Sequence, residues 1–281
     1  MEFKGTLFTY NKSLRLTAFE SGATNSNKAL IFLEGLTDGY NGVPYLSALN
    51  DAVTKLDYSL IQMQTTSFYN GYGASSLAND AKELDYLIGY LRQHRNKTHI
   101  VVMGHSTGCQ DCYWHNKYGR HRQHVAGYIL QAPVSDRQYY AAECPEYADH
   151  LQLASTMREQ GRGAEWMPRS VSDVPVTADR FYSLVARGGD DDVFSTDLTD
   201  EELNLIYKDV NQPMMAVNGQ EDEYYRSSVD RMVFLERLQK VCPAIRNIHV
   251  VAGADHKVNN PQAQIALVEL VSSFLESVKD F

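Results

Sequence analysis

A serine between two glycines, in the stretch Gly104-His105-Ser106-Thr107-Gly108, is the side chain of this sequence best suited to covalent chemistry. The stretch follows a β-branched apolar run at residues 99–103 and precedes a helix-like segment. A strand, Gly-x-Ser-x-Gly and a helix in this order form a sharp turn in which bulkier neighbours would clash. The turn also sets the hydroxyl at a helix N-terminus, where developing negative charge is favoured. The pattern therefore predicts that Ser106 is a nucleophile; a glycine-rich turn that merely contains a serine is the alternative.

A nucleophilic serine needs a base, because its hydroxyl reacts poorly until its proton is removed. In proteins with this turn the chain order is serine, then acid, then histidine. Of the nine histidines, only His249 and His256 lie in the last fifth of the chain. His249 falls inside a predicted strand, whereas His256 follows that strand in the loop GADHKV. We therefore predict that His256 is the base, against the alternative of an ordinary surface histidine.

The acid that orients the base is expected just after the penultimate predicted strand, residues 212–217. The stretch MMAVNGQEDEYY offers Glu221, Asp222 and Glu223 there. We predict Asp222, because its short loop and short side chain suit a carboxylate that stabilises the imidazolium form of His256. Glu221 and Glu223 remain alternatives, and a solvated acidic loop is the non-catalytic interpretation.

An oxyanion hole requires two backbone N–H groups aimed at one oxygen. Thr107 directly follows the proposed nucleophile and is predicted to supply the first. Leu36, in the loop EGLTDG after the third predicted strand, is predicted to supply the second. Glu34 stands where such loops often carry a histidine before the glycine, and the sequence alone assigns it no role.

Short apolar strands alternate with amphipathic helices, which predicts an α/β fold with a mainly parallel sheet. The expected strands are residues 5–10, 14–19, 29–33, 59–64, 99–103, 125–130, 212–217 and 248–251. Helices are expected near Pro44, over 76–92, from Thr107, over 228–239 and over 261–278. In the last helix the expected buried stripe is Ile265, Val268, Leu270, Val271, Phe274 and Leu275.

Residues 134–205 interrupt this alternation with many charged and tyrosine side chains and no clear strand. We predict a lid or cap insertion within a single domain spanning residues 1–281, with a plain surface excursion as the alternative. Its acidic side chains could attract a cationic ligand, or could simply be surface charge; they are Glu143, Glu146, Asp190, Asp191 and Asp192.

Composition excludes several classes of function. The chain of 281 residues has 26 basic and 35 acidic side chains, a formal net charge of −9, which argues against a nucleic-acid partner. No apolar run approaches the roughly 20 residues that span a bilayer, and no leader-like segment begins the chain, so a cytoplasmic protein without a membrane partner is expected. Four cysteines are too few for a disulfide framework, and Cys109 and Cys112 are better interpreted as buried side chains than as a metal site.

Five stretches together resemble the fungal siderophore (fusarinine) esterase family of α/β-hydrolases, long catalogued as a domain of unknown function. They are EGLTDGYNGVPYL, GHSTGCQD, APVSDR, GGDDDVFSTDL and GQEDEYY, and the likeness runs from about residue 30 to residue 256. The resemblance implies an α/β-hydrolase fold, no cofactor, and a catalytic triad of Ser106, Asp222 and His256. One departure follows the stretch Asp222-Glu223-Tyr224. This chain continues with Tyr225 and Arg226, where the family has an apolar residue and proline.

The resemblance also implies a small-molecule ester substrate, specifically a fusarinine-type siderophore whose hydrolysis releases iron inside the cell. Asp38, Tyr72 and Tyr139 are the predicted substrate-binding residues, although such tyrosines are often partly buried core residues. Two other functions stay open at this point. The same triad serves thioesterases and acyltransferases, and a hydrolase scaffold can also be a non-catalytic binding module.

Overall fold

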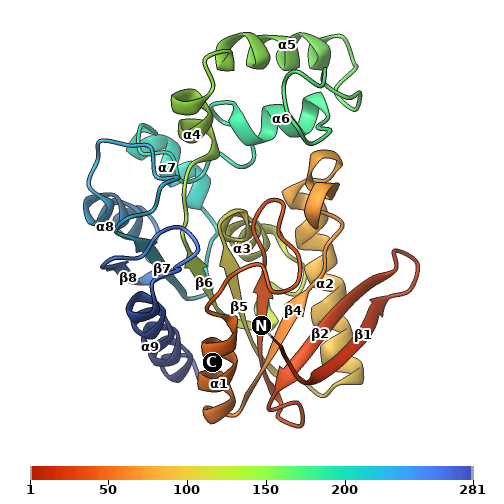
Figure 1. Ribbon diagram of the computed structural model, residues 1–281, viewed down its shortest axis with the longest axis vertical. Helices are drawn as coiled ribbons and strands as arrows, with labels where there is room; N and C mark the ends of the chain where they lie inside the picture. The colour runs from red at the N-terminus through yellow and green to blue at the C-terminus, as the bar shows by residue number, and fades with distance from the viewer. Residues whose placement is uncertain (1, 280–281) are drawn as a thin grey trace.

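The computed structural model describes residues 2–279, and its centre is one eight-stranded sheet (Figure 1). The strands are β1 (Gly5–Asn11), β2 (Leu16–Gly22), β3 (Lys28–Leu33), β4 (Tyr58–Met63), β5 (His99–His105), β6 (Val125–Gln131), β7 (Met214–Gly219) and β8 (Ile245–Val251). Their order across the sheet is β1-β2-β4-β3-β5-β6-β7-β8. The first two strands pair antiparallel with their neighbours, and all pairs from β4 to β8 are parallel. This arrangement confirms the predicted α/β fold with a mainly parallel sheet.

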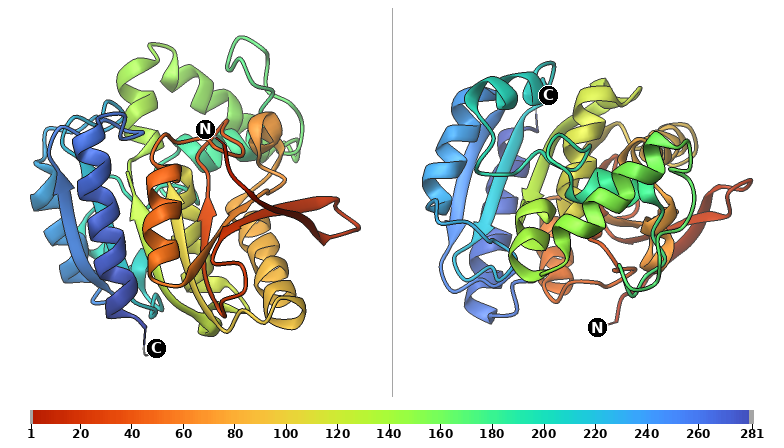
Figure 2. Two further views of the ribbon diagram at one scale, coloured as in Figure 1. Left: turned by 60° about the horizontal axis from the view of Figure 1, so that its bottom comes forward. Right: turned by 90° about the horizontal axis from the view of Figure 1, so that it is seen from above.

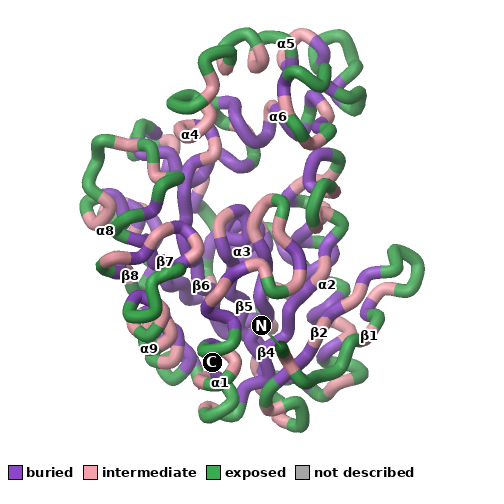
Figure 3. The backbone as a smooth tube through the Cα atoms, viewed as in Figure 1, coloured by how far each residue is buried: buried purple, intermediate pink, exposed green. Residues whose placement is uncertain are grey.

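Helices cover both faces of the sheet, as its almost wholly buried central strands require. One face carries α1 (Leu46–Lys55) and α9 (Pro261–Ser277), which contact each other. The other carries α2 (Leu77–His94), α3 (Thr107–Tyr118) and α8 (Arg231–Val241). Each face has its own hydrophobic core, and Figures 2 and 3 show these helices around the buried strands.

The predicted helix faces are largely, but not wholly, the buried ones. In α2 the apolar stripe is buried throughout, and its residues are Leu77, Ala81, Leu84, Ile88 and Leu91. The hydroxyl of Ser76 caps the helix by accepting from the backbone N–H of Asn79. In α9 the prediction for Ile265 is wrong, because 53% of its surface is exposed. The buried face of α9 passes instead through Ala263, Leu267 and Val271.

The chain between β6 and β7, residues 132–213, is here called the cap segment. It contains α4 (Asp136–Glu143), α5 (Tyr147–Glu159), α6 (Ala178–Val185) and α7 (Asp200–Tyr207), and adds no strand to the sheet. Figure 1 shows α4, α5 and α6 above the carboxyl ends of the parallel strands. Helices α5 and α6 pack together around a separate hydrophobic cluster that includes Met157 and Phe181. Tyr72 in the short helix η1 (Tyr69–Ala74) joins that cluster.

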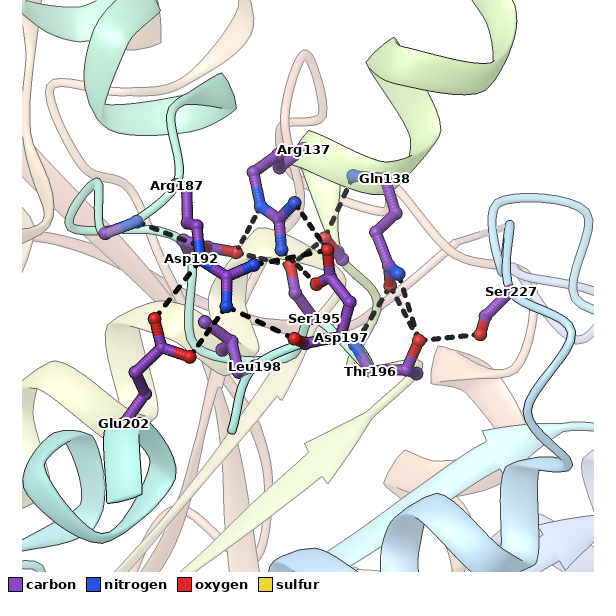
Figure 4. Close-up of polar contacts among 12 residues, drawn as sticks. Arg137, Gln138, Arg187, Asp192, Ser195, Thr196, Asp197, Leu198, Glu202 and Ser227 are labelled. Carbon is purple, nitrogen blue, oxygen red and sulfur yellow. Dashed lines mark hydrogen bonds and ion pairs between the residues drawn. The ribbon is translucent and has the colours of Figure 1, made fainter. Parts of the chain in front are cut away.

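Ion pairs and hydrogen bonds fix the base of the cap segment (Figure 4). Arg137 at the start of α4 donates to Asp192 at 2.9 Å and also pairs with Asp197. Thr196 contacts both Gln138 of α4 and, at 2.6 Å, Ser227. The network therefore ties the cap segment to the loop that follows β7.

The acidic run at residues 190–192 was expected either to attract a ligand or to be surface charge, and its contacts decide part of this. Asp191 and Asp192 are buried, and each pairs with an arginine of the cap segment. They are therefore not surface charge, whereas Asp190 is exposed.

Two further features concern the whole described chain, residues 2–279. None of its helices is long and apolar enough to cross a membrane, and Cys109 and Cys112 are free and buried.

Candidate active site

The turn between β5 and α3 holds Ser106 in a strained backbone conformation, with φ 54° and ψ −122°. Glycine is needed on both sides of it. A Cβ at Gly104 would lie 2.0 Å from the carbonyl oxygen of Gly108, and a Cβ at Gly108 would lie 2.6 Å from that of Leu33. The Gly-x-Ser-x-Gly pattern is therefore explained by close backbone packing, and the serine sits at the N-cap of α3.

Three side chains from distant parts of the sequence meet at this edge of the sheet. His256 Nε2 lies 2.9 Å from Ser106 Oγ, and His256 Nδ1 lies 2.9 Å from Asp222 Oδ2 and 3.0 Å from Oδ1. Asp222 follows β7 and His256 follows β8. Only 2% of Asp222 and 4% of His256 is exposed. The arrangement links a hydroxyl, an imidazole and a buried carboxylate in one chain of hydrogen bonds.

The loop after β7 also shows what its other acidic residues do. Asp222 Oδ1 accepts from the backbone N–H of Tyr224 at 2.9 Å, which fixes the carboxylate. Glu223 Oε2 accepts from the backbone N–H of His256 at 3.0 Å. Glu221 is exposed, and its backbone N–H donates to Ala254. Within residues 2–279, Asp222 is thus the carboxylate at the imidazole, while Glu223 holds the backbone of the histidine loop.

The loop after β3 approaches the serine closely. A Cβ on Gly35 would lie 2.9 Å from the Cβ of Ser106, so only glycine fits there. The backbone N–H groups of Leu36 and Thr107 donate to no other backbone group in the part of the chain described. Both residues line one small cavity beside the serine turn. The two amides are therefore free to receive a substrate oxygen.

The predicted substrate-binding residues have different surroundings. Asp38 pairs with Lys257 at 2.7 Å, so its carboxylate already has a cationic partner next to His256. Tyr72 is buried and lines the cavity beside Leu36. Tyr139 of α4 packs against Tyr224, with 4.8 Å between ring centroids. The roles of these three residues in substrate binding stay predictions.

A buried polar network that the sequence did not reveal supports the histidine. His105 Nδ1 lies 2.6 Å from Gln131 Oε1, which also accepts from the hydroxyl of Tyr45 at 2.8 Å. Gln131 Nε2 donates to the carbonyl oxygen of His256 at 3.2 Å. Burial, followed by the neighbouring His256, lowers the pKa of His105 well below its usual value, so it is neutral at pH 7. Only the place of His105 inside the glycine-serine motif could have drawn attention to this network.

Glu34, to which the sequence assigned no role, is a buried carboxyl next to the serine turn. Neither of its carboxyl oxygens has a hydrogen-bond partner within residues 2–279. Burial, with a smaller contribution from nearby Asp38, raises its pKa to about 8. Glu34 is therefore mostly protonated at pH 7.

No group of three or more His, Cys, Asp or Glu side chains in residues 2–279 is placed to hold a metal ion.

The chain is similar over almost its whole length to several fungal proteins. A UPF0613 protein of Schizosaccharomyces pombe is 28% identical, over 99% of this chain and 97% of its own. The fusarinine C esterase sidJ of Aspergillus fumigatus is 27% identical, over 91% of this chain and 90% of its own. Among solved structures, the siderophore hydrolase EstB of Aspergillus fumigatus matches with a TM-score of 0.81 and 26% identity, covering 100% of this chain and 99% of its own.

These likenesses bear out the predicted α/β-hydrolase fold, the predicted resemblance to siderophore esterases, and the predicted class of protein, an ester-hydrolysing enzyme. Fusarinine C and siderophores, which appear in these names, are substrates of the relatives. The sequence pattern of the family described as "Protein of unknown function (DUF1749)" matches residues 1–278, almost the whole chain. With that coverage, the chain belongs to the DUF1749 family.

Proposed function

We propose that the enzyme hydrolyses carboxylic esters by covalent catalysis, with Ser106 as nucleophile, His256 as base and Asp222 as the group that orients the base. The observation that carries this proposal is the continuous contact from Asp222 through His256 to Ser106, with both steps at 2.9 Å. The geometry matches the roles that a serine-histidine-aspartate triad requires.

In the proposed reaction, Ser106 Oγ attacks the ester carbonyl carbon while His256 Nε2 takes the hydroxyl proton. The carbonyl oxygen becomes negatively charged and receives hydrogen bonds from the amides of Leu36 and Thr107. His256 returns the proton to the leaving alcohol as the C–O bond breaks, which leaves an acyl-enzyme. Water, deprotonated by His256, then releases the acid and restores Ser106.

For the substrate, we propose esters of fusarinine-type siderophores, whose hydrolysis would release iron in the cytoplasm. Support comes from the names of two relatives, a fusarinine C esterase and a siderophore hydrolase, both aligned over at least 90% of this chain. We further propose that the cap segment covers the bound substrate, because α4 to α6 lie above the strand ends that carry Ser106.

Replacement of Ser106 by alanine tests the mechanism. Ser106→Ala should lose ester hydrolysis and labelling by a fluorophosphonate probe, while Ser47→Ala, an exposed serine of α1, should keep both. Equal labelling of the two variants would refute the assignment of the nucleophile. Mass spectrometry of products from iron-free and iron-loaded fusarinine-type siderophores, beside simple aryl esters, tests the substrate proposal. Turnover of the aryl esters alone would refute it.

A further inference from the structure

A small, partly open cavity lies beside the serine turn, beneath the cap segment. Its volume of about 20 Å³ is enough for one water-sized group. The loop after β3 and the start of α3 form one side of it, and the loop after β4, η1, the start of α2 and α6 contribute the rest. Gly35, Leu36 and Thr107 line it, so it adjoins the proposed oxyanion hole.

Several oxygen atoms around this cavity are buried without a partner. Thr107 Oγ1 and Asp111 Oδ1 have no hydrogen-bond partner within residues 2–279, and neither carboxyl oxygen of Glu34 has one. The exposed fraction is 6% for Thr107 and 8% for Asp111. These two residues lie one turn apart on the same face of α3. Burying such acceptors costs free energy unless a donor reaches them. Arg180 Nε is the one unpartnered side-chain N–H donor among the described lining residues, so most of the unpartnered atoms favour a ligand with N–H or O–H groups.

Carboxyl groups outnumber basic side chains around the cavity. Glu34, Asp80 and Asp111 line it, and Arg180 is the one lysine or arginine among the described lining residues. Arg180 donates to a fourth carboxylate, Asp191, at 2.6 Å.

Asp80 is held only by neutral donors in the described chain, with Ser67 Oγ at 2.6 Å. Burial raises its pKa to about 7, and burial, followed by the repulsion of Asp80, raises the pKa of Asp111 well above its usual value. A cation that entered the cavity would favour the ionised form of both carboxyl groups and would be attracted to them.

We propose that this cavity is a subsite for a primary ammonium group of the ester substrate, bound by the carboxylate of Asp111 and the hydroxyl of Thr107. This inference rests on the proposed function. A primary ammonium carries three N–H donors, and its head fits a space for one water. Thr107 would offer its backbone N–H to the oxyanion and its hydroxyl to the ammonium. The amino group and the scissile carbonyl therefore lie close together on the same substrate molecule.

Binding to the Ser106→Ala variant tests the subsite without turnover. Three probes share one carbon skeleton: the methyl esters of 2-aminopentanoic acid, its N-acetyl derivative and pentanoic acid. We expect calorimetry at pH 7 to show at least tenfold tighter binding of the free amine than of the other two. Equal dissociation constants for the three esters would overturn the inference.

A second substitution locates the effect. In the Ser106→Ala background, Asp111→Asn should reduce the preference for the amine by about tenfold or more, because hydrogen bonds to charged groups are worth about that much. Asp190→Asn removes the same charge from an exposed position of the cap segment and should leave the preference unchanged. A preference equally lost in both variants would indicate long-range attraction and refute the subsite. Should Asp111→Asn fail to fold, the three-probe comparison still decides the proposal.

Turnover by the wild-type chain separates this inference from the proposed function. If none of the three esters and no aryl ester is hydrolysed, the proposed function fails, and the binding comparison still tests the subsite. If all three are hydrolysed but the amine binds no better than its analogues, the subsite fails and the proposed function stands.

Discussion

The phenol ring of Tyr224 packs against the imidazole ring of His256, with 4.4 Å between the ring centroids. Tyr224 is just two residues from Asp222, and its backbone N–H donates to that carboxylate. One loop therefore supplies both the carboxylate and an aromatic surface to the same imidazole.

We expect Tyr224→Ala to lower kcat for a simple ester by about 2- to 10-fold, since an aromatic contact is worth about 0.5–1.5 kcal/mol. Without the ring, the imidazole loses a contact that restricts its orientation. Tyr224→Phe keeps the ring and should keep the rate. Steady-state kinetics of both variants check this; an unchanged kcat in Tyr224→Ala would show that the tyrosine ring does not help to orient the histidine.

Asp222→Asn should lower kcat by about 10³- to 10⁴-fold. The amide keeps the shape of the side chain but can present a donor to Nδ1, and it cannot stabilise a positively charged imidazole. Glu223→Gln is the control, because within residues 2–279 the one hydrogen bond of the Glu223 side chain comes from the backbone N–H of His256, and the amide oxygen of glutamine can still accept it. Comparable losses in the two variants would contradict the assignment of the acid.

Glu34→Gln should change how stability depends on pH. Burial raises the pKa of Glu34 from 4.5 to about 8, so its favourable contribution is complete below about pH 4.5 and is lost as pH rises toward 8. Glutamine resembles the protonated carboxyl and does not titrate. The variant should therefore gain stability relative to the wild type as pH rises, by an amount on the order of 5 kcal/mol at most.

Urea unfolding of the wild type and of Glu34→Gln at pH 5, 7 and 9 measures this difference. Glu236→Gln, at an exposed position of α8, is a matched control that should show no such trend. A difference in unfolding free energy that stays constant from pH 5 to pH 9 would show that Glu34 ionises normally.

Lys97→Met should destabilise the fold by about 3 kcal/mol, because it leaves a buried carboxylate short of a partner. Lys97 and Glu20 are fully buried and lie 2.8 Å apart. Burial opposes ionisation of Glu20, but hydrogen bonds from Lys97 and Arg95 outweigh it and lower the pKa of that carboxyl. The pair therefore stabilises the protein above the ordinary pKa of glutamate, and the contribution is lost as pH falls through the lowered value.

Thermal and urea unfolding at pH 7 check this expectation. Arg162→Met removes an exposed ion pair with Glu165 and should leave stability nearly unchanged. Similar losses of unfolding free energy in the two variants would show that burial does not determine how much the Lys97–Glu20 pair contributes to stability.

The sequence predicted the strands well because β-branched runs and glycine turns are local signals. The serine turn is also local, since Gly104 and Gly108 must lack side chains wherever such a turn occurs. The juxtaposition of Ser106, Asp222 and His256 followed from parallel topology, which brings the carboxyl ends of strands to one edge of the sheet. Ile265 was placed wrongly because an apolar residue can lie beside the buried stripe of a helix and still face solvent.

Other features depend on contacts that no local pattern encodes. Gln131 lies 125 residues before the His256 carbonyl to which it donates. The environment of Glu34 depends on the backbone at Gly42 and on the nearby charge of Lys257. The environment of Asp111 depends on Arg180 of the cap segment. Tertiary packing sets the protonation of these carboxyls, so it could not be predicted from composition or spacing.

The chain leaves the sheet for the cap segment at the end of β6 and returns to it at the start of β7, and these two strands are direct neighbours, paired from Tyr128 with Met214 to Gln131 with Val217. The sheet therefore fixes the register of both attachment points whatever the length of chain between them. Over evolutionary time, mutation can lengthen, shorten or replace this stretch without moving the reacting atoms. Descendants of one ancestral gene should then diverge in the molecules they accept well before they diverge in the reaction they perform.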